Sequence, residues 1–263
     1  MDMGIAGKVA LVAASSRGLG RAVAMGLAAE GVNLVICARN EETLRNTADE
    51  IREQTGARVV AVPADLTDPA YADYLIEATV DSFRGLDILV TNAGGPPAGP
   101  PLSFSDEAWV KAFELNFLSG VRLIRSGIPH MAEKGWGRII NITSVTVKEP
   151  LAGLMLSNAV RMSVVGFAKT LADEVAAQGI TVNNVCPGWT RTDRVVELFR
   201  QRAEAQQITP EQAAAGIISN IPVGRMGTPE EFASLVVYLA SAHAGYITGE
   251  SILIDGGQHR SSL

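Results

Sequence analysis

Short, almost uninterrupted apolar runs recur along this chain and alternate with segments of helical pattern. The first such run is VALVA (residues 9–13), and the last is SILI within SILIDGG (residues 251–257). These runs are typical of strands buried on both faces, because a half-exposed strand would alternate apolar and polar residues. Their alternation with helices predicts an α/β fold, a doubly wound parallel sheet of about seven strands with helices on both faces.

The composition is that of a soluble, intracellular protein. Of 263 residues, 47% are hydrophobic and 19% are charged, which allows a large core and argues against wholesale disorder. The net charge is −6 and no basic block is present, so we expect no nucleic-acid partner. No apolar run approaches the roughly 18 residues of a membrane span, so we expect no membrane partner and a cytoplasmic location.

One segment departs from simple alternation of strand and helix. We expect a single dinucleotide-binding domain over residues 1–263, because no linker or repeat divides the chain. Residues 192–222 are helical in pattern but longer than a simple crossover, and they follow the carboxyl end of a predicted strand. An insertion at that edge of the sheet predicts a lid over a substrate. Cysteine and histidine show no metal-ligand spacing, so no metal is expected.

The sequence AASSRGLG joins the first predicted strand to the first predicted helix. Glycine in such a turn lets the backbone approach a pyrophosphate, which then sits at the helix N-terminus. Gly18 and Gly20 are present, but Ala14 stands where a further glycine would help. Taken alone, the motif therefore leaves a simple tight turn as the alternative.

Several motifs in order resemble the short-chain dehydrogenase/reductase family over nearly the whole chain. They are AASSRGLG, ADL, TNAG, ELNFLSG with Asn116, IINITS with Ser144, VNNVCPGWTRT, and GRMGTPEEFASLVVYLAS followed by YITGESILIDGG. The general pattern is most similar to 3-oxoacyl carrier-protein reductases and to glucose dehydrogenase-like members of the family. The resemblance implies a Rossmann fold, a nicotinamide cofactor, a small-molecule carbonyl or alcohol substrate, and a homodimer or homotetramer.

The resemblance also implies which residues contact the cofactor. The pyrophosphate side is expected to meet Ser15, Arg17, Gly18, Leu19 and Gly20, and the adenine is expected to meet Asp65 and Leu66. The adenosine ribose is expected to meet Asn92, Ala93 and Gly94, and the nicotinamide Pro187, Gly188 and Thr190. Thr192 is expected to reach either the nicotinamide carboxamide or the pyrophosphate. After the second strand, Ala38 stands where an acidic residue would bind a ribose 2′-hydroxyl, and Arg39 follows it. Because an arginine suits a 2′-phosphate, the sequence favours NADP, with NAD as the alternative.

The expected proton donor is missing. The family uses a serine, an asparagine, a tyrosine and a lysine, and Ser144 and Asn116 match the first two. Ser157 and Arg161 stand where the tyrosine and lysine belong. Serine is shorter and far less acidic than a phenol, and arginine stays charged and donates protons poorly. Arginine can still bind ribose hydroxyls and stabilise negative charge.

Lys148 lies just past Ser144 and is a candidate for a substitute donor, although an exposed loop lysine is more often only a solvated charge. Three functions compete. The first is an NADP-dependent oxidoreductase with an atypical active site. The second is a cofactor-binding sensor or partner subunit without dehydrogenase activity, and the third is a non-redox reaction in the same cleft.

Overall fold

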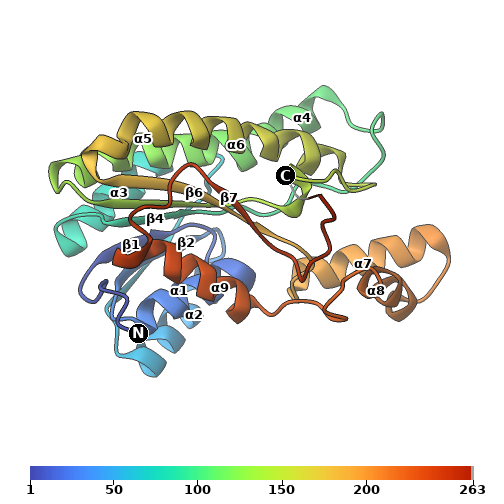
Figure 1. The fold of residues 1–263 in the computed structure, drawn as a ribbon, viewed down its shortest axis with the longest axis horizontal. Helices are drawn as coiled ribbons and strands as arrows, with labels where there is room; N and C mark the ends of the chain where they lie inside the picture. The colour runs from blue at the N-terminus through green and yellow to red at the C-terminus, as the bar shows by residue number, and fades with distance from the viewer. Residues whose placement is uncertain (262–263) are drawn as a thin grey trace.

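The computed structural model describes residues 1–261 and contains a seven-stranded sheet in which every neighbouring pair of strands is parallel (Figure 1). The strand order is β3-β2-β1-β4-β5-β6-β7, so the chain winds outward from β1 in both directions. This confirms the doubly wound sheet expected from the apolar runs. The strands are β1 (Val9–Val12), β2 (Asn33–Ala38), β3 (Val59–Pro63), β4 (Ile88–Thr91), β5 (Gly137–Ile142), β6 (Ile180–Pro187) and β7 (Ser251–Ile254).

Helices cover both faces of the sheet and form a separate hydrophobic core on each (Figure 1). One face carries α1 (Gly18–Ala29), α2 (Glu41–Thr55) and α9 (Pro229–Ala240). The other carries α3 (Ala70–Phe83), α4 (Asp106–Phe113), α5 (Ser119–Glu133) and α6 (Met155–Val175). Strands buried between two helical layers have no solvated face, which explains their nearly continuous apolar sequence.

Local signals set the ends of several helices. The Asn40 side chain accepts a hydrogen bond of 2.9 Å from the Thr43 amide and so caps α2, as its sequence predicts. Gly31 follows α1 with a φ of 78°, a left-handed conformation that glycine adopts at little cost. These contacts span only a few residues, which is why the sequence reveals them.

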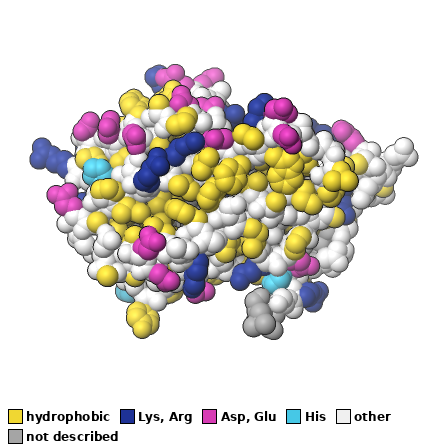
Figure 2. All heavy atoms as spheres, turned by 90° about the horizontal axis from the view of Figure 1, so that it is seen from above, with side chains coloured by type: hydrophobic (Ala, Val, Ile, Leu, Met, Phe, Trp, Pro, Cys, Tyr) yellow, Lys and Arg dark blue, Asp and Glu magenta, His cyan; other side chains and the backbone are white. Residues whose placement is uncertain are grey.

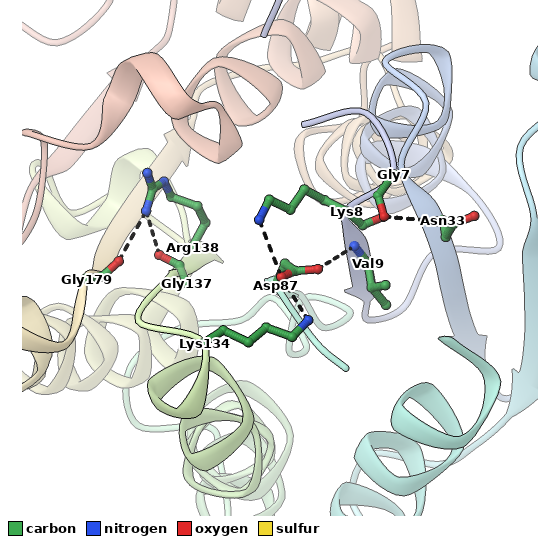
Figure 3. A network of polar contacts seen from close by, with 9 residues as sticks. All are labelled: Gly7, Lys8, Val9, Asn33, Asp87, Lys134, Gly137, Arg138 and Gly179. Atoms are coloured by element: carbon green, nitrogen blue, oxygen red, sulfur yellow. Dashed lines mark hydrogen bonds and ion pairs between the residues drawn. The ribbon is translucent and has the colours of Figure 1, made fainter. Parts of the chain in front are cut away.

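Buried charge gathers at the amino ends of β1, β4 and β5 (Figure 3). The Asp87 carboxylate accepts hydrogen bonds from the Val9 amide at 2.9 Å and the Lys134 ammonium at 3.0 Å, and Lys8 lies 3.7 Å away. Arg138 donates to backbone carbonyls and stacks on the Trp136 ring, 4.3 Å from its centroid. Every charge drawn here thus finds its partner within the protein.

Two helices follow β6 at the opposite, carboxyl edge of the sheet. They are α7 (Asp193–Gln206) and α8 (Pro210–Ile218), and they occupy the segment expected to be a lid. Figure 1 shows them extending away from the two helical layers, beyond the carboxyl ends of the strands. Within residues 1–261, no helix is long and apolar enough to cross a membrane.

Candidate active site

The turn after β1 is tight and depends on its glycines. A Cβ on Gly20 would lie 2.4 Å from the Ala14 carbonyl oxygen, so only glycine fits there. Ala14 has a φ of 47°, which is strained for a residue with a side chain, and Gly18 has a φ of 58°. The Asn92 side chain donates to the Ala14 carbonyl at 3.2 Å and ties this turn to the end of β4.

Two residues flank this turn differently. Ser15 is fully buried and its hydroxyl donates to the Val12 carbonyl at 2.8 Å, so it is already occupied. Arg17 is exposed at the start of α1. The helix N-terminus beside it carries backbone amides and a positive dipole, an arrangement suited to a phosphate group.

The ends of β2 and β3 bring Arg39 and Asp65 near each other. The Thr67 amide donates to the Asp65 carboxylate at 3.0 Å, and this contact, with a smaller contribution from the Arg39 charge, holds the pKa of Asp65 below its usual range. Arg39 is exposed and makes no ion pair with any described residue. Its guanidinium is therefore free to meet a ligand from solvent.

Asn116 lies in a π-helical turn, Glu114–Leu118, between α4 and α5. Its side-chain nitrogen donates to the Gly94 carbonyl at 2.9 Å, whereas its side-chain oxygen is buried without a hydrogen-bond partner. Asn116 lines a cavity of about 20 Å³, enough for a water molecule, together with Asn92, Ala93 and Arg161. π-Helical turns are frequent at functional sites, and the sequence did not reveal this one.

Arg161 is a buried cation on α6. Its side chain is 8% exposed and donates to the Ile142 carbonyl at 3.1 Å. Burial lowers the pKa of its guanidinium to about 10, with a smaller influence from the Arg194 charge. The group nevertheless stays protonated at neutral pH.

Ser157 lies one helical turn before Arg161, and its hydroxyl meets that of Thr146. Its hydroxyl is 3.4 Å from that of Thr146, and the Thr146 amide donates to the Ser144 hydroxyl at 3.1 Å. Ser157 is 8% exposed. The sequence reasoning missed Thr146, which carries no signal apart from its place two residues after Ser144.

Lys148 lies outside these contacts, exposed in the loop that follows β5. Its charge and that of Arg161 both act on the thiol of Cys186, although burial dominates and raises the pKa of that thiol. The structure thus leaves the Lys148 ammonium in solvent, at the rim of the site.

The segment after β6 packs against the first turn of α1. A Cβ on Gly188 would lie 2.7 Å from the Cβ of Asp255, so this position must also be glycine. The Thr192 hydroxyl caps α7, and its methyl lies 3.7 Å from the place of a Cβ on Gly18. The remaining predicted cofactor positions lie at the start of α1 (Leu19), after β3 (Leu66), at the end of β6 (Pro187) and just after β6 (Thr190).

Arg194, in the first turn of α7, is a residue that sequence reasoning missed. It donates to the Pro96 carbonyl at 2.7 Å, and its Nε atom is 3.2 Å from the place of a Cβ on Gly95. It thereby bridges from α7 to the loop after β4. Its position two residues after the matched VNNVCPGWTRT segment, which ends at Thr192, was the available signal.

Taken together, the structure gathers most of the predicted site at the carboxyl edge of the sheet. Asn116 and Arg161 share one cavity, and Ser144 and Ser157 both contact Thr146, the first its backbone amide and the second its hydroxyl. Such a cleft at the reversal of strand order is where doubly wound folds bind their ligands. Among residues 1–261, no group of three or more His, Cys, Asp or Glu side chains could hold a metal ion.

Comparison with known proteins agrees with this geometry. Residues 13–259 match the protein family described as Enoyl-(Acyl carrier protein) reductase. The 3-oxoacyl-[acyl-carrier-protein] reductase of Escherichia coli is 38% identical over 257 residues, covering 98% of this chain and 99% of that protein.

Two solved structures are similar over almost their whole length. L-sorbose reductase from Gluconobacter frateurii, complexed with NADPH and L-sorbose, has a TM-score of 0.94 and 34% identity, covering 99% of this chain and 100% of that one. Actinorhodin polyketide ketoreductase with NADPH has a TM-score of 0.92 and 34% identity, covering 95% and 97%. By motif order, fold and similarity over the whole chain, the protein belongs to the short-chain dehydrogenase/reductase family of oxidoreductases.

Proposed function

We propose that this protein is an NADPH-dependent reductase of a small carbonyl compound, able in principle to oxidise the corresponding alcohol, with an atypical active site. The observation that carries the proposal is Arg161, a buried cation that lines a cavity together with Asn116. Serine and arginine at positions 157 and 161 replace the tyrosine and lysine of the family pattern. Several structural relatives are NADPH complexes, which supports the choice of cofactor.

The residues at the carboxyl edge fit a dinucleotide. The turn at Gly18 and Gly20 leads into the N-terminus of α1, whose backbone amides suit a pyrophosphate, and the exposed Arg39 and Arg17 suit a 2′-phosphate. NADPH, when bound, supplies the hydride. NAD remains the alternative, and exchange of charge at position 39 decides between them.

The protein itself must stabilise the developing negative charge, orient the carbonyl group and allow a proton to reach the oxygen. Arg161 holds a permanent positive charge where the substrate oxygen becomes negative, which lowers the barrier without a proton transfer from the residue itself. Ser144 orients the carbonyl group. Because a serine hydroxyl is a weak acid and Ser157 lies buried beside Thr146, we infer that water delivers the proton to the oxygen.

The experiment is NADPH oxidation by the purified protein with a panel of ketones and aldehydes. Restoring the family pair with Ser157→Tyr and Arg161→Lys should raise the rate by about 100-fold, because a positioned general acid contributes about 10²- to 10⁴-fold. Arg161→Lys alone is the matched control and should gain little, since it adds no acid within reach.

The Lys148→Ala variant tests whether Lys148 is the proton donor. Complete loss of turnover with unchanged NADPH affinity would assign the proton to Lys148 in place of water. Failure of the parent and of the double variant on every carbonyl compound would instead support a cofactor-binding protein without dehydrogenase activity. The buried position of Ser157, which leaves no acid at the expected place, is the observation that favours this second candidate.

We also propose a homodimer or homotetramer, formed through α4, α5 and α6. Val110, Phe113 and Met162 are 61%, 38% and 48% exposed, and a groove of about 390 Å³ lies between α4 and α6. Figure 2 shows hydrophobic side chains gathered on this face of the molecule. Exposed apolar surface of this kind marks interaction sites. Sedimentation of only a 27.7 kDa species at micromolar concentration would contradict the assembly.

The chain is proposed to act as a single domain in which residues 192–222, a segment that contains α7 and α8, form a substrate lid. The Trp189 ring, just after β6, packs 5.5 Å from that of Phe199 on α7, between ring centroids, and so joins the base of the site to the lid. The fluorescence of Trp189 should therefore change when a substrate closes the lid. A cytoplasmic location stays a prediction.

A further inference from the structure

We propose that Arg194 is a positioning residue, which couples the lid to the two elements that carry Asn116 and Ser157. It does so by binding the loop of residues 94–104 between β4 and α4 (hereafter the β4 loop). This inference rests on the proposed function for its effect on catalysis. It deepens that function, because it gives a role in the reaction to a lid residue outside the matched motifs.

The lid has few attachments to the rest of the protein. Its two ends meet at a short stem, where Thr190 pairs with Gly227 and the Gly227 amide donates to the Trp189 carbonyl at 3.0 Å. Within residues 1–261, none of the three hydrophobic clusters contains a residue of α7 or α8, which extend beyond the helical layers (Figure 1). A segment with so few buried apolar contacts opens at low free-energy cost.

One side chain joins the lid to the β4 loop. Arg194, in the first turn of α7, donates from Nη2 to the Pro96 carbonyl at 2.7 Å. Between the lid (residues 192–222) and the remainder of residues 1–260, it is the only side-chain hydrogen bond or ion pair. Because a charged donor makes a stronger hydrogen bond than a neutral one, this contact is the main polar restraint on the lid.

Gly95 leaves room for this guanidinium. A Cβ on Gly95 would have three atoms of Arg194 as its nearest neighbours, namely Nε at 3.2 Å, Nη2 at 3.6 Å and Cζ at 3.7 Å. The guanidinium therefore packs against the backbone of Gly95 as well as bonding Pro96. Burial lowers the pKa of Arg194, and the charge of Glu197 opposes this shift. Even an alanine methyl at position 95 would press on the guanidinium.

The β4 loop also holds the π-helical turn and the start of α6. Near the beginning of the loop, the Gly94 carbonyl accepts the 2.9 Å hydrogen bond from the Asn116 side chain. Further along, the Gly99 amide donates to the Gly153 carbonyl at 2.8 Å, and Gly99 pairs with the residue that precedes α6. That helix carries Ser157 in its first turn.

The Arg194 contact at Pro96 thus lies between two anchors of one short loop. Displacement of the guanidinium frees the middle of this loop and should loosen both anchors, since neighbouring backbone contacts open together. A misplacement of about 1 Å at a reacting group can cost about 10²-fold in rate. A lid bound through Arg194 therefore keeps the Asn116 side chain and the start of α6 in place for the reaction.

The test is amide hydrogen exchange of the β4 loop and of α7, measured by mass spectrometry on the protein without ligand. Arg194→Met removes every N–H donor but keeps most of the side-chain length. It should raise exchange in both segments by about tenfold, the worth of one hydrogen bond from a charged group. Arg194→Lys keeps a charged donor and should recover most of the protection.

Arg200→Met is the matched control, because it removes the same charge from an exposed position of α7. Exchange in the β4 loop should stay within about twofold of the parent, as expected for an exposed pair. Equal effects of Arg194→Met and Arg200→Met on the β4 loop would overturn the inference. So would an Arg194→Met variant whose exchange rises in α7 alone.

Gly95→Ala tests the same contact from the loop. Gly95 has no left-handed φ, so alanine adds only the methyl that displaces the guanidinium. Its exchange in the β4 loop should rise about as much as that of Arg194→Met. The double variant should exceed Arg194→Met by little, because substitutions of residues in contact are not additive. A Gly95→Ala variant with the exchange of the parent would overturn the inference.

Kinetics with NADPH and the carbonyl panel test the consequence for catalysis. Arg194→Met should lower kcat by about tenfold, and Arg194→Lys should restore most of it. A higher KM with unchanged kcat would overturn the coupling, because the lid would then only retain the substrate. A parent that turns over no carbonyl compound would overturn the proposed function, whereas the exchange measurements would still decide whether Arg194 couples the lid to the β4 loop.

Discussion

The two edges of the sheet use buried charge in opposite ways. At the amino edge, Asp87 is met by the Val9 amide, Lys134 and Lys8, so its carboxylate is fully partnered inside the protein (Figure 3). At the carboxyl edge, Arg161 has one carbonyl partner and the side-chain oxygen of Asn116 has none. The first edge is complete without a ligand, and the second is not.

This difference follows from where each edge lies in the fold. Loops at the amino edge only return the chain from a helix to the next strand, so their polar groups are free to bond one another. Loops at the carboxyl edge open toward α7 and α8, where helix N-termini and unpaired donors converge. A substitution at the amino edge should therefore change stability, and one at the carboxyl edge should change binding.

The largest effect expected from this comparison is on stability at Asp87. Asp87→Ala leaves the Val9 amide unpaired and two lysines without their counter-charge, so it should lower the free energy of unfolding by about 2–4 kcal/mol. Denaturant unfolding measures it. Asp49→Ala, which breaks an exposed pair with Arg52, is the control and should cost less than about 1 kcal/mol. If the folded Asp87→Ala variant bound NADPH more weakly than the parent, the amino edge would also affect binding, which would contradict the distinction between the two edges.

The next largest expected effect is a change in cofactor preference when Arg39 is replaced. Arg39→Asp replaces a cation suited to a 2′-phosphate by an acid suited to a 2′-hydroxyl, so NADPH should lose and NADH gain about tenfold in affinity, about 1.4 kcal/mol each. Fluorescence titration with both cofactors measures this, and stability should not change because Arg39 is exposed. The control is Arg45→Gln, on the exposed side of α2. Equal affinities that the substitution leaves unchanged would reject the assignment.

A smaller effect is expected at Ala14. Its φ of 47° is strained for alanine, and glycine relieves that strain, so Ala14→Gly should stabilise the protein by about 1 kcal/mol. Because the extra methyl also narrows the turn, NADPH affinity should rise. Thermal unfolding and cofactor titration measure the two effects. Gly20→Ala is the opposite change and should destroy the turn, since its Cβ would meet the Ala14 carbonyl.

The smallest effect concerns an exposed pair that is complete in itself, Arg225 with Glu231. Their hydrogen bonds of 2.7 and 2.8 Å lower the pKa of the Glu231 carboxyl to about 2. A lowered carboxyl pKa gives stability that is present above the unfolded value, near pH 4.3, and is lost as the pH falls toward 2. Glu231→Gln keeps the cap of α9, so its melting temperature should be slightly lower than the parent's at pH 6 and converge on it near pH 2. A difference in melting temperature that stayed the same at all pH values would exclude the Glu231 charge as its cause.

Much of the fold could be predicted because its signals are local. The buried strands can be recognised in the sequence by their apolar runs. The helix cap at Asn40 and the left-handed conformation of Gly31 depend only on residues a few positions away. The candidate site was predictable in part, because ordered motifs place Asn116, Ser144 and Arg161 at known spacings. Neither the π-helical turn around Asn116 nor the contact between Ser157 and Thr146 has such a local signal.

The sequence by itself determined the layered sheet, the turn that suits a phosphate, and the identity of the residues at positions 157 and 161. Only the tertiary structure decided what those residues face. Arg194 reaches Pro96 across 98 residues, and Asp87 meets Val9 across 78. Apolar periodicity records which side of an element is buried, but it says nothing of which distant polar group will lie opposite. That pairing is set by how the elements pack, because hydrogen bonds and ion pairs need atoms within a few ångströms of one another.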